Sequence, residues 1–277
     1  GRSSDTPTEQ PRSHGPRQAS SLRAANCPAL LHDRGVTVSD AACSSPHTKC
    51  VVCFGDSVTQ GVPVVAPDDT FVALLGRRLD MRYQPQFGVR TINAGVSGEN
   101  TWEGLARIER DVLAHQPVLV TVEFGLNDIR WEPEKTVSEE QFATNLREMH
   151  RRIADTGAGV IFMTPNPIVG LYHVYSHGLD YYDRWGGCDG LSAIYAGIIR
   201  QVAAELAAPL CDIYAAFVEE AVRAEFRGET FDYRDLSVLS RYISSQDGVH
   251  PTAAGQELIA GELYGTIVSH DLLAACE

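Results

Sequence analysis

The segment Cys50–Ser57, which reads CVVCFGDS, decides the fold. Its first five residues are all apolar, which is typical of a strand covered on both faces within a parallel sheet. Gly55 then allows the chain to turn sharply where the strand ends. A serine that follows a strand is most often a turn or helix-capping residue, so Ser57 alone does not indicate catalysis.

Apolar runs of strand length recur along the chain and alternate with stretches of helical length. We expect strands at 50–54, 89–93, 118–124, 160–164 and 210–213, and helices near 69–80, 101–114, 138–155, 191–207, 214–225 and 252–269. Asp68 or Asp69 is expected to cap the first of these helices, and Ser138 with Gln141 forms a capping-box pattern. This alternation gives right-handed crossovers and predicts a three-layer α/β domain around a parallel sheet.

The composition is that of a globular protein with an extended start. Of the 277 residues, 44% are apolar and 21% are charged, which is enough for a substantial core. Residues 1–25 are rich in Ser, Arg, Pro and Gln and read as flexible. We therefore expect a partly flexible N-terminal extension over 1–48 and one folded domain over 49–277.

The charge and hydropathy patterns exclude some classes of partner. A formal net charge of -13 argues against nucleic-acid binding, because phosphate contacts need clustered Lys and Arg. No apolar run reaches about 18 residues, so no membrane span is expected. We expect a soluble protein and slightly favour the cytoplasm over secretion, while the oligomeric state stays open.

The seven cysteines include one C-x-x-C pair, Cys50 and Cys53, which lies inside the first expected strand. Side chains three apart on a strand point to opposite faces, so a structural role is favoured over a zinc or redox site. Cys27 and Cys43 lie in the extension and could pair in an oxidising compartment.

Ligands of such a sheet bind outside the carboxyl ends of its strands. Ser57 follows the first expected strand and could be a nucleophile. Gly95 follows the second and could present its backbone N–H to a developing oxyanion, or simply form a tight turn. Asn127 follows the third, where its amide could donate to the same oxyanion or close an Asx-turn.

The segment Asp247–Pro251, which reads DGVHP, supplies an acid and a base. Pro251 suits the first position of the last helix, which leaves His250 on the loop before it. Asp247 could fold back onto one ring nitrogen of His250, so that the other nitrogen accepts the serine proton. A surface turn or part of a metal site remains an alternative, but no further His or Cys lies nearby in sequence.

Together these segments resemble the four sequence blocks of the SGNH hydrolases, also called the GDSL esterase/lipase family, over about residues 49–270. The resemblance implies a flavodoxin-like five-stranded sheet of order 2-1-3-4-5 and carboxylic ester hydrolysis without a metal or cofactor. It implies a catalytic triad of Ser57, Asp247 and His250. The oxyanion hole would be formed by Ser57, Gly95 and Asn127. The matching blocks are Gly55-Asp56-Ser57, Gly95, Gly125-x-Asn127-Asp128 and Asp247-x-x-His250-Pro251.

The substrate is less well defined by the sequence. An aromatic-rich connection at 165–190 could roof the site or pack onto its own domain. We expect a small-molecule ester of a lipid, an acylated sugar or a natural-product acyl group. An acyltransferase on the same scaffold and a non-catalytic binding module are the alternatives. Candidate substrate contacts are Trp102, Trp131, Tyr172 and His173.

Overall fold

The computed structural model describes residues 48–61, 65–170, 173, 180–226 and 237–274. The expected N-terminal extension lies outside these ranges except for Thr48, so its boundary, its flexible start and the Cys27–Cys43 pair stay predictions. Tyr172 also lies outside the described residues.

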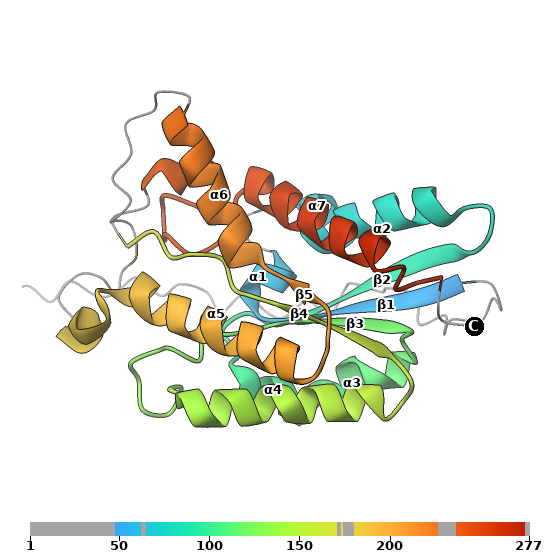
Figure 1. Cartoon of the computed structure of the whole chain (residues 1–277), viewed down its shortest axis with the longest axis horizontal. Coiled ribbons are helices and arrows are strands. Elements are labelled where there is room, and N and C mark those ends of the chain that lie inside the picture. The colour runs from blue at the N-terminus through green and yellow to red at the C-terminus, as the bar shows by residue number, and fades with distance from the viewer. Residues whose placement is uncertain (1–47, 62–64, 171–172, 174–179, 227–236, 275–277) are drawn as a thin grey trace, which may run out of the picture. The chain divides into compact units, whose positions relative to one another are not determined.

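A five-stranded parallel sheet forms the centre of the domain, with strand order β2-β1-β3-β4-β5 (Figure 1). This order confirms the expected α/β class and the topology that the family resemblance implied. All five strands lie where the sequence predicts them, although their ends differ. Their bounds are β1 Thr48–Gly55, β2 Gly88–Gly95, β3 Leu119–Glu123, β4 Gly159–Met163 and β5 Leu210–Cys211.

Helices cover both faces of the sheet (Figure 1). One face carries α2 (Phe71–Tyr83), α6 (Ile213–Phe226) and α7 (Ala253–Ser269), and the other carries α3 (Thr101–Asp111), α4 (Glu139–Ala154) and α5 (Cys188–Glu205). The single turn α1 (Ser57–Gln60) follows β1 directly. The described 3-10 turns are η1 Pro67–Asp69, η2 Leu113–His115, η4 Asp180–Trp185 and η5 Ser237–Arg241.

The core explains why β1 is apolar from Cys50 onward. Its residues from Cys50 to Gly55 are buried, as expected for a strand with neighbours on both sides and helices on both faces. Cys50 and Cys53 are both buried in this core, as the structural interpretation of the C-x-x-C pair predicts. Burial raises the pKa of Cys53 to about 12, so its thiol stays protonated.

Several helix starts differ from the sequence prediction. Helix α7 begins at Ala253 with Thr252 as its cap, so Pro251 lies before the cap and not at the first helical position. Asp68 and Asp69 belong to η1, and the cap of α2 is Thr70, whose side chain accepts from the Ala73 amide at 3.3 Å. Ser138 does cap α4, because its Oγ accepts from the Gln141 amide at 3.2 Å. The Gln141 side chain, however, donates along the helix to Asn145.

Candidate active site

The nucleophile candidate lies at the carboxyl end of the central strand. Ser57 is the first residue of α1, and only 6% of its surface is exposed. Asp56 caps this turn, because its Oδ1 accepts from the Val58 amide at 2.9 Å. The cap holds the chain in a sharp bend, so the Ser57 side chain leaves the strand axis and reaches the loop before α7.

Ser57, His250 and Asp247 form one hydrogen-bonded chain. His250 Nε2 lies 2.9 Å from Ser57 Oγ, and its Nδ1 lies 3.0 Å from Asp247 Oδ2. The second oxygen of Asp247 accepts from the backbone amides of Val249 and His250 at 2.9 and 3.0 Å. Burial opposes ionisation of Asp247, but these amide bonds outweigh it and lower the pKa of the carboxyl. The three residues predicted as a triad are therefore in contact, with the acid in its charged form.

The loop that carries Asp247 and His250 is fastened to the segment after β4. The Val169 amide donates to the Gly248 carbonyl at 2.8 Å, and Asn166 Nδ2 donates to the Val249 carbonyl at 2.8 Å. Asn166 is fully buried, and nothing in its sequence context singled it out. Its position fixes the acid–base loop relative to the strand ends.

Asn127 and Gly95 differ in whether they can donate a hydrogen bond to an oxyanion. Asn127 lines the cavity next to Ser57, and its Nδ2 donates to Asp56 Oδ2 and to the Glu99 carbonyl, both at 3.1 Å. The Gly95 amide donates to Asn93 Oδ1 at 3.0 Å, so the prediction that it offers a free N–H is wrong. Gly95 is required for another reason: a Cβ there would lie 2.2 Å from the backbone nitrogen of Gln60.

The turn after Gly95 contains a second glycine that the sequence analysis missed. Gly98 has a φ of +80°, which favours glycine, and its amide has no hydrogen-bond acceptor among the described residues. The neighbouring Ser97 amide donates to Gln60 Oε1 at 2.9 Å, and the Glu99 amide to the Val96 carbonyl. Within this turn, Gly98 is the amide that is left for a ligand.

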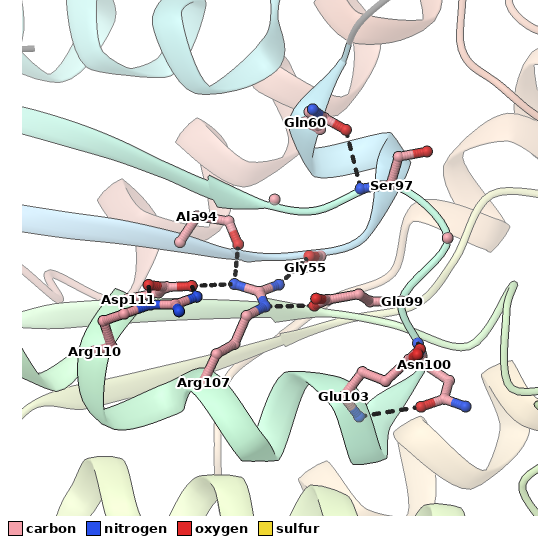
Figure 2. A network of polar contacts seen from close by, with 12 residues as sticks. Gly55, Gln60, Ala94, Ser97, Glu99, Asn100, Glu103, Arg107, Arg110 and Asp111 are labelled. Carbon is pink, nitrogen blue, oxygen red and sulfur yellow. Dashed lines mark hydrogen bonds and ion pairs between the residues drawn. The ribbon is translucent and has the colours of Figure 1, made fainter. Parts of the chain in front are cut away.

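A buried guanidinium joins this turn to the nucleophile's strand (Figure 2). Arg107 of α3 donates through Nη2 to the Gly55 carbonyl and through Nη1 to the Ala94 carbonyl, both at 2.8 Å. Its Nε pairs with the Glu99 carboxylate. One side chain therefore ties the ends of β1 and β2 to the segment whose carbonyl holds Asn127.

Asp128 does not contact the histidine. It is fully buried, and its Oδ1 accepts from the Thr101 amide at 3.0 Å and from Thr101 Oγ1 at 2.5 Å. Burial raises the pKa of Asp128 to about 7. Its side chain therefore anchors the first turn of α3, while Asp247 is the acid bound to His250.

A cavity of about 380 Å³ opens over the triad. Of the residues expected at the substrate, His173 lines it, and His173 Nδ1 lies 3.1 Å from the Asp247 carbonyl. Trp102 and Trp131 do not line it, and their surfaces are 43% and 40% exposed. The lining residues are Ser57, Leu126, Asn127, Arg130, Ile168, His173, Gln246, Asp247, Val249 and His250.

Within the described ranges, no group of three or more His, Cys, Asp or Glu side chains is placed to hold a metal ion. No helix within them is long and apolar enough to cross a membrane.

Comparisons with known proteins agree with the fold and show the family. An acetylxylan esterase of Geobacillus stearothermophilus is 28% identical over 184 residues, which cover 64% of this chain and 71% of that protein. An arylesterase of Vibrio mimicus is 34% identical over 132 residues, or 44% of this chain and 57% of its own. The solved structure of a lipase/acylhydrolase from Enterococcus faecalis has the same fold, with a TM-score of 0.60 and 24% identity over 80% of this chain and 96% of that one. A model of the GDSL-like lipase/acylhydrolase family matches residues 53–258, and the chain belongs to this family.

Proposed function

We propose that this protein hydrolyses carboxylic esters through an acyl-enzyme on Ser57. The observation that carries the proposal is the position of His250, whose two ring nitrogens contact Ser57 Oγ at 2.9 Å and Asp247 Oδ2 at 3.0 Å. A neutral histidine held in this way has one nitrogen donating to the acid and the other ready to accept the serine proton.

The reaction then proceeds in two halves. His250 takes the Ser57 proton as Oγ attacks the ester carbonyl, and it returns that proton to the departing alcohol. Water repeats the sequence on the acyl-enzyme and releases the acid. Asp247 stays ionised throughout and stabilises the imidazolium form that appears in each half.

Three groups are candidates to donate to the oxyanion, and Asn127 would exchange one of its present acceptors for it. The amides of Ser57 and Gly98 have no acceptor among the described residues, and Asn127 lines the same cavity. We therefore assign the glycine donor to Gly98 in place of Gly95. Donors fixed by turns and by buried partners need little rearrangement when charge develops on the carbonyl oxygen.

We further infer a small ester, with an acetylated sugar or an aryl ester as the first substrates to test. The cavity lies near the lower end of the usual range of about 300–1,000 Å³ for small-molecule sites. The relatives named acetylxylan esterase and arylesterase support the same choice. Leu126, Ile168 and Val249 offer an apolar wall, while Arg130 and Gln246 bring polar groups for an alcohol part.

The test is a turnover screen with p-nitrophenyl acetate, butyrate and octanoate beside acetylated xylooligosaccharides. We expect the short esters to be hydrolysed fastest. The Ser57→Ala variant should lose more than about a thousandfold of kcat while its circular dichroism spectrum stays unchanged. Larger residual activity would indicate another nucleophile, such as Ser97. Product analysis with added alcohols separates hydrolysis from acyl transfer, and absence of any turnover would favour a binding module.

A further inference from the structure

Two buried carboxyl groups lie next to the nucleophile, and the proposed reaction uses neither. Asp56 precedes Ser57 and is fully buried, and Glu123 is 1% exposed at the end of β3. Glu123 is the register partner of Gly55 on the adjacent strand β1. The two acids therefore approach each other from neighbouring strand ends, inside the protein.

The contacts of the pair leave one oxygen without an ordinary donor. Glu123 Oε2 accepts from Thr59 Oγ1 at 2.9 Å. Glu123 Oε1 is buried and has no hydrogen-bond partner of ordinary geometry among the described residues. The Asp56 carboxyl lies within hydrogen-bonding reach of the Glu123 side chain, as do the backbone amides of Asp56 and Thr59. Two carboxyl groups form a hydrogen bond only when one of them carries a proton.

The charges around the pair also favour a shared proton. Arg107, a buried cation at the strand ends, donates to two backbone carbonyls, Glu99 and Asp111. His250 lowers the pKa of Asp56, but Asp128 acts in the opposite direction. Burial raises the pKa of both Asp56 and Glu123, and the charge of Glu123 raises that of Asp56 further. Two buried anions side by side would be much less stable than one anion and one acid.

We propose that Glu123 is a positioning residue, which shares one proton with Asp56 and thereby keeps the pair at a single negative charge while Asp56 holds the Asn127 amide. This role rests on the proposed function, because Asn127 matters to the rate only if an oxyanion forms. The link is direct: Asp56 Oδ2 accepts from Asn127 Nδ2 at 3.1 Å.

The shared proton has a consequence for the oxyanion hole. Both Nδ2 hydrogens of Asn127 already have acceptors, Asp56 Oδ2 and the Glu99 carbonyl. An oxyanion must compete for one of them, and a fully charged carboxylate holds a hydrogen more strongly than a carboxyl whose charge is shared. A second negative charge beside Ser57 would also repel the oxyanion. Loss of the shared proton should therefore lower kcat more than it changes KM.

The experiment compares kcat and KM across pH for the wild type, Glu123→Gln, Glu123→Ala and Asp128→Asn. In Glu123→Gln the side-chain oxygen can still accept from Thr59 and the amide can donate to Asp56, which keeps the pair at one negative charge. We expect kcat within about threefold of wild type near neutral pH and no decline of kcat at alkaline pH. The wild type should decline there as its second carboxyl ionises.

Two other variants separate this role from a structural one. Glu123→Ala removes the partner of Asp56, so kcat should fall about tenfold or more with little change in KM. Asp128→Asn is the matched control, because Asp128 is equally buried but binds Thr101, and it should keep the alkaline decline of the wild type. Circular dichroism at each pH excludes unfolding. An alkaline decline in Glu123→Gln like that of the wild type would overturn the proposal, as would equal losses of kcat in Glu123→Gln and Glu123→Ala.

Infrared spectroscopy tests the proton without any turnover. At mildly acidic pH, the wild type should show the carbonyl band of a protonated carboxylic acid from Asp128 and a second such band from the pair. Glu123→Gln should remove the band of the pair, and Asp128→Asn should leave this band in place. A wild type that hydrolyses esters but lacks this band overturns the shared proton and leaves the proposed function intact. A wild type that shows the band but hydrolyses no ester overturns the proposed function, and the positioning role with it.

Discussion

Asn127 is held by acceptors from two separate segments, Asp56 and the Glu99 carbonyl. Its side chain is therefore oriented before any ester binds, as an oxyanion donor must be. We expect Asn127→Ala to lower kcat about 10²–10³-fold with a small effect on KM, because the amide binds the transition state more tightly than the substrate. Steady-state kinetics with p-nitrophenyl acetate measure both constants.

Asn145 provides a matched control on α4. It is buried, and its Nδ2 donates to Thr101 Oγ1 at 2.8 Å, but it does not line the cavity. Asn145→Ala should lower the melting temperature and leave kcat close to wild type. A rise in KM with unchanged kcat in Asn127→Ala would instead make Asn127 a substrate-binding residue.

At this scale, residues that act within one short segment were predictable from the sequence. Asp247 and His250 are three residues apart before a proline, so their contact needs little more than a turn. The choice between Gly95 and Gly98 was not predictable, because it depends on the Asn93 side chain turning back to the Gly95 amide. Which backbone N–H group remains without an acceptor, and can therefore bind an oxyanion, depends on tertiary contacts that cannot be inferred from residue types alone.

Helix α3 does more than cover the sheet, because Arg107 links three segments of the site. Arg107→Lys should lower both stability and kcat, because an ammonium group cannot bond the Gly55 carbonyl, the Ala94 carbonyl and Glu99 with the geometry of a guanidinium. We expect a loss on the order of 2 kcal/mol in the free energy of unfolding and about a tenfold lower kcat. Urea denaturation and kinetics on the same preparation measure the two effects.

Arg110→Lys is the control within the same helix. Arg110 is exposed and bonds only to its neighbour Asp111 among the described residues, so both stability and kcat should stay near wild type. If Arg107→Lys behaved like Arg110→Lys, the contacts of the Arg107 guanidinium shown in Figure 2 would not be needed to hold the strand ends.

The ends of the elements were predicted less well than their existence. The fifth strand was expected to reach Ile213, but β5 ends at Cys211 and α6 begins at Ile213. Asp212 explains the difference, because its Oδ1 accepts from the Ala215 amide at 3.2 Å and starts the helix. An apolar run predicts a strand, whereas a capping side chain within the same run favours the start of a helix. The tertiary contacts of the folded protein decide which of the two forms.

For the whole molecule, unbroken apolar strands predicted a sheet buried on both faces, and the candidate site residues lie at its carboxyl ends, where the sequence placed them. The strand order came from the family resemblance, since periodicity within a strand carries no information about its neighbours. The N-terminal extension and the cellular location stay predictions, and the oligomeric state stays open. Buried acids such as Asp128 were also not predictable, because Asp is a common surface residue.

Asp128 gives a test of stability against pH. Burial raises its pKa in the folded protein from 3.8 to about 7, so between these values the folded state keeps a proton that the unfolded state has lost. The stabilisation is complete below the unfolded pKa and disappears as pH rises through about 7, with an upper limit of about 4 kcal/mol.

Asp128→Asn cannot ionise and keeps an oxygen for Thr101. Relative to this variant, the wild type should therefore lose about 3 kcal/mol between about pH 5 and pH 8, as measured by urea denaturation. Glu140→Gln, at an exposed position on α4, should follow the wild type at every pH. A constant difference between wild type and Asp128→Asn would mean that Asp128 is already ionised at pH 5.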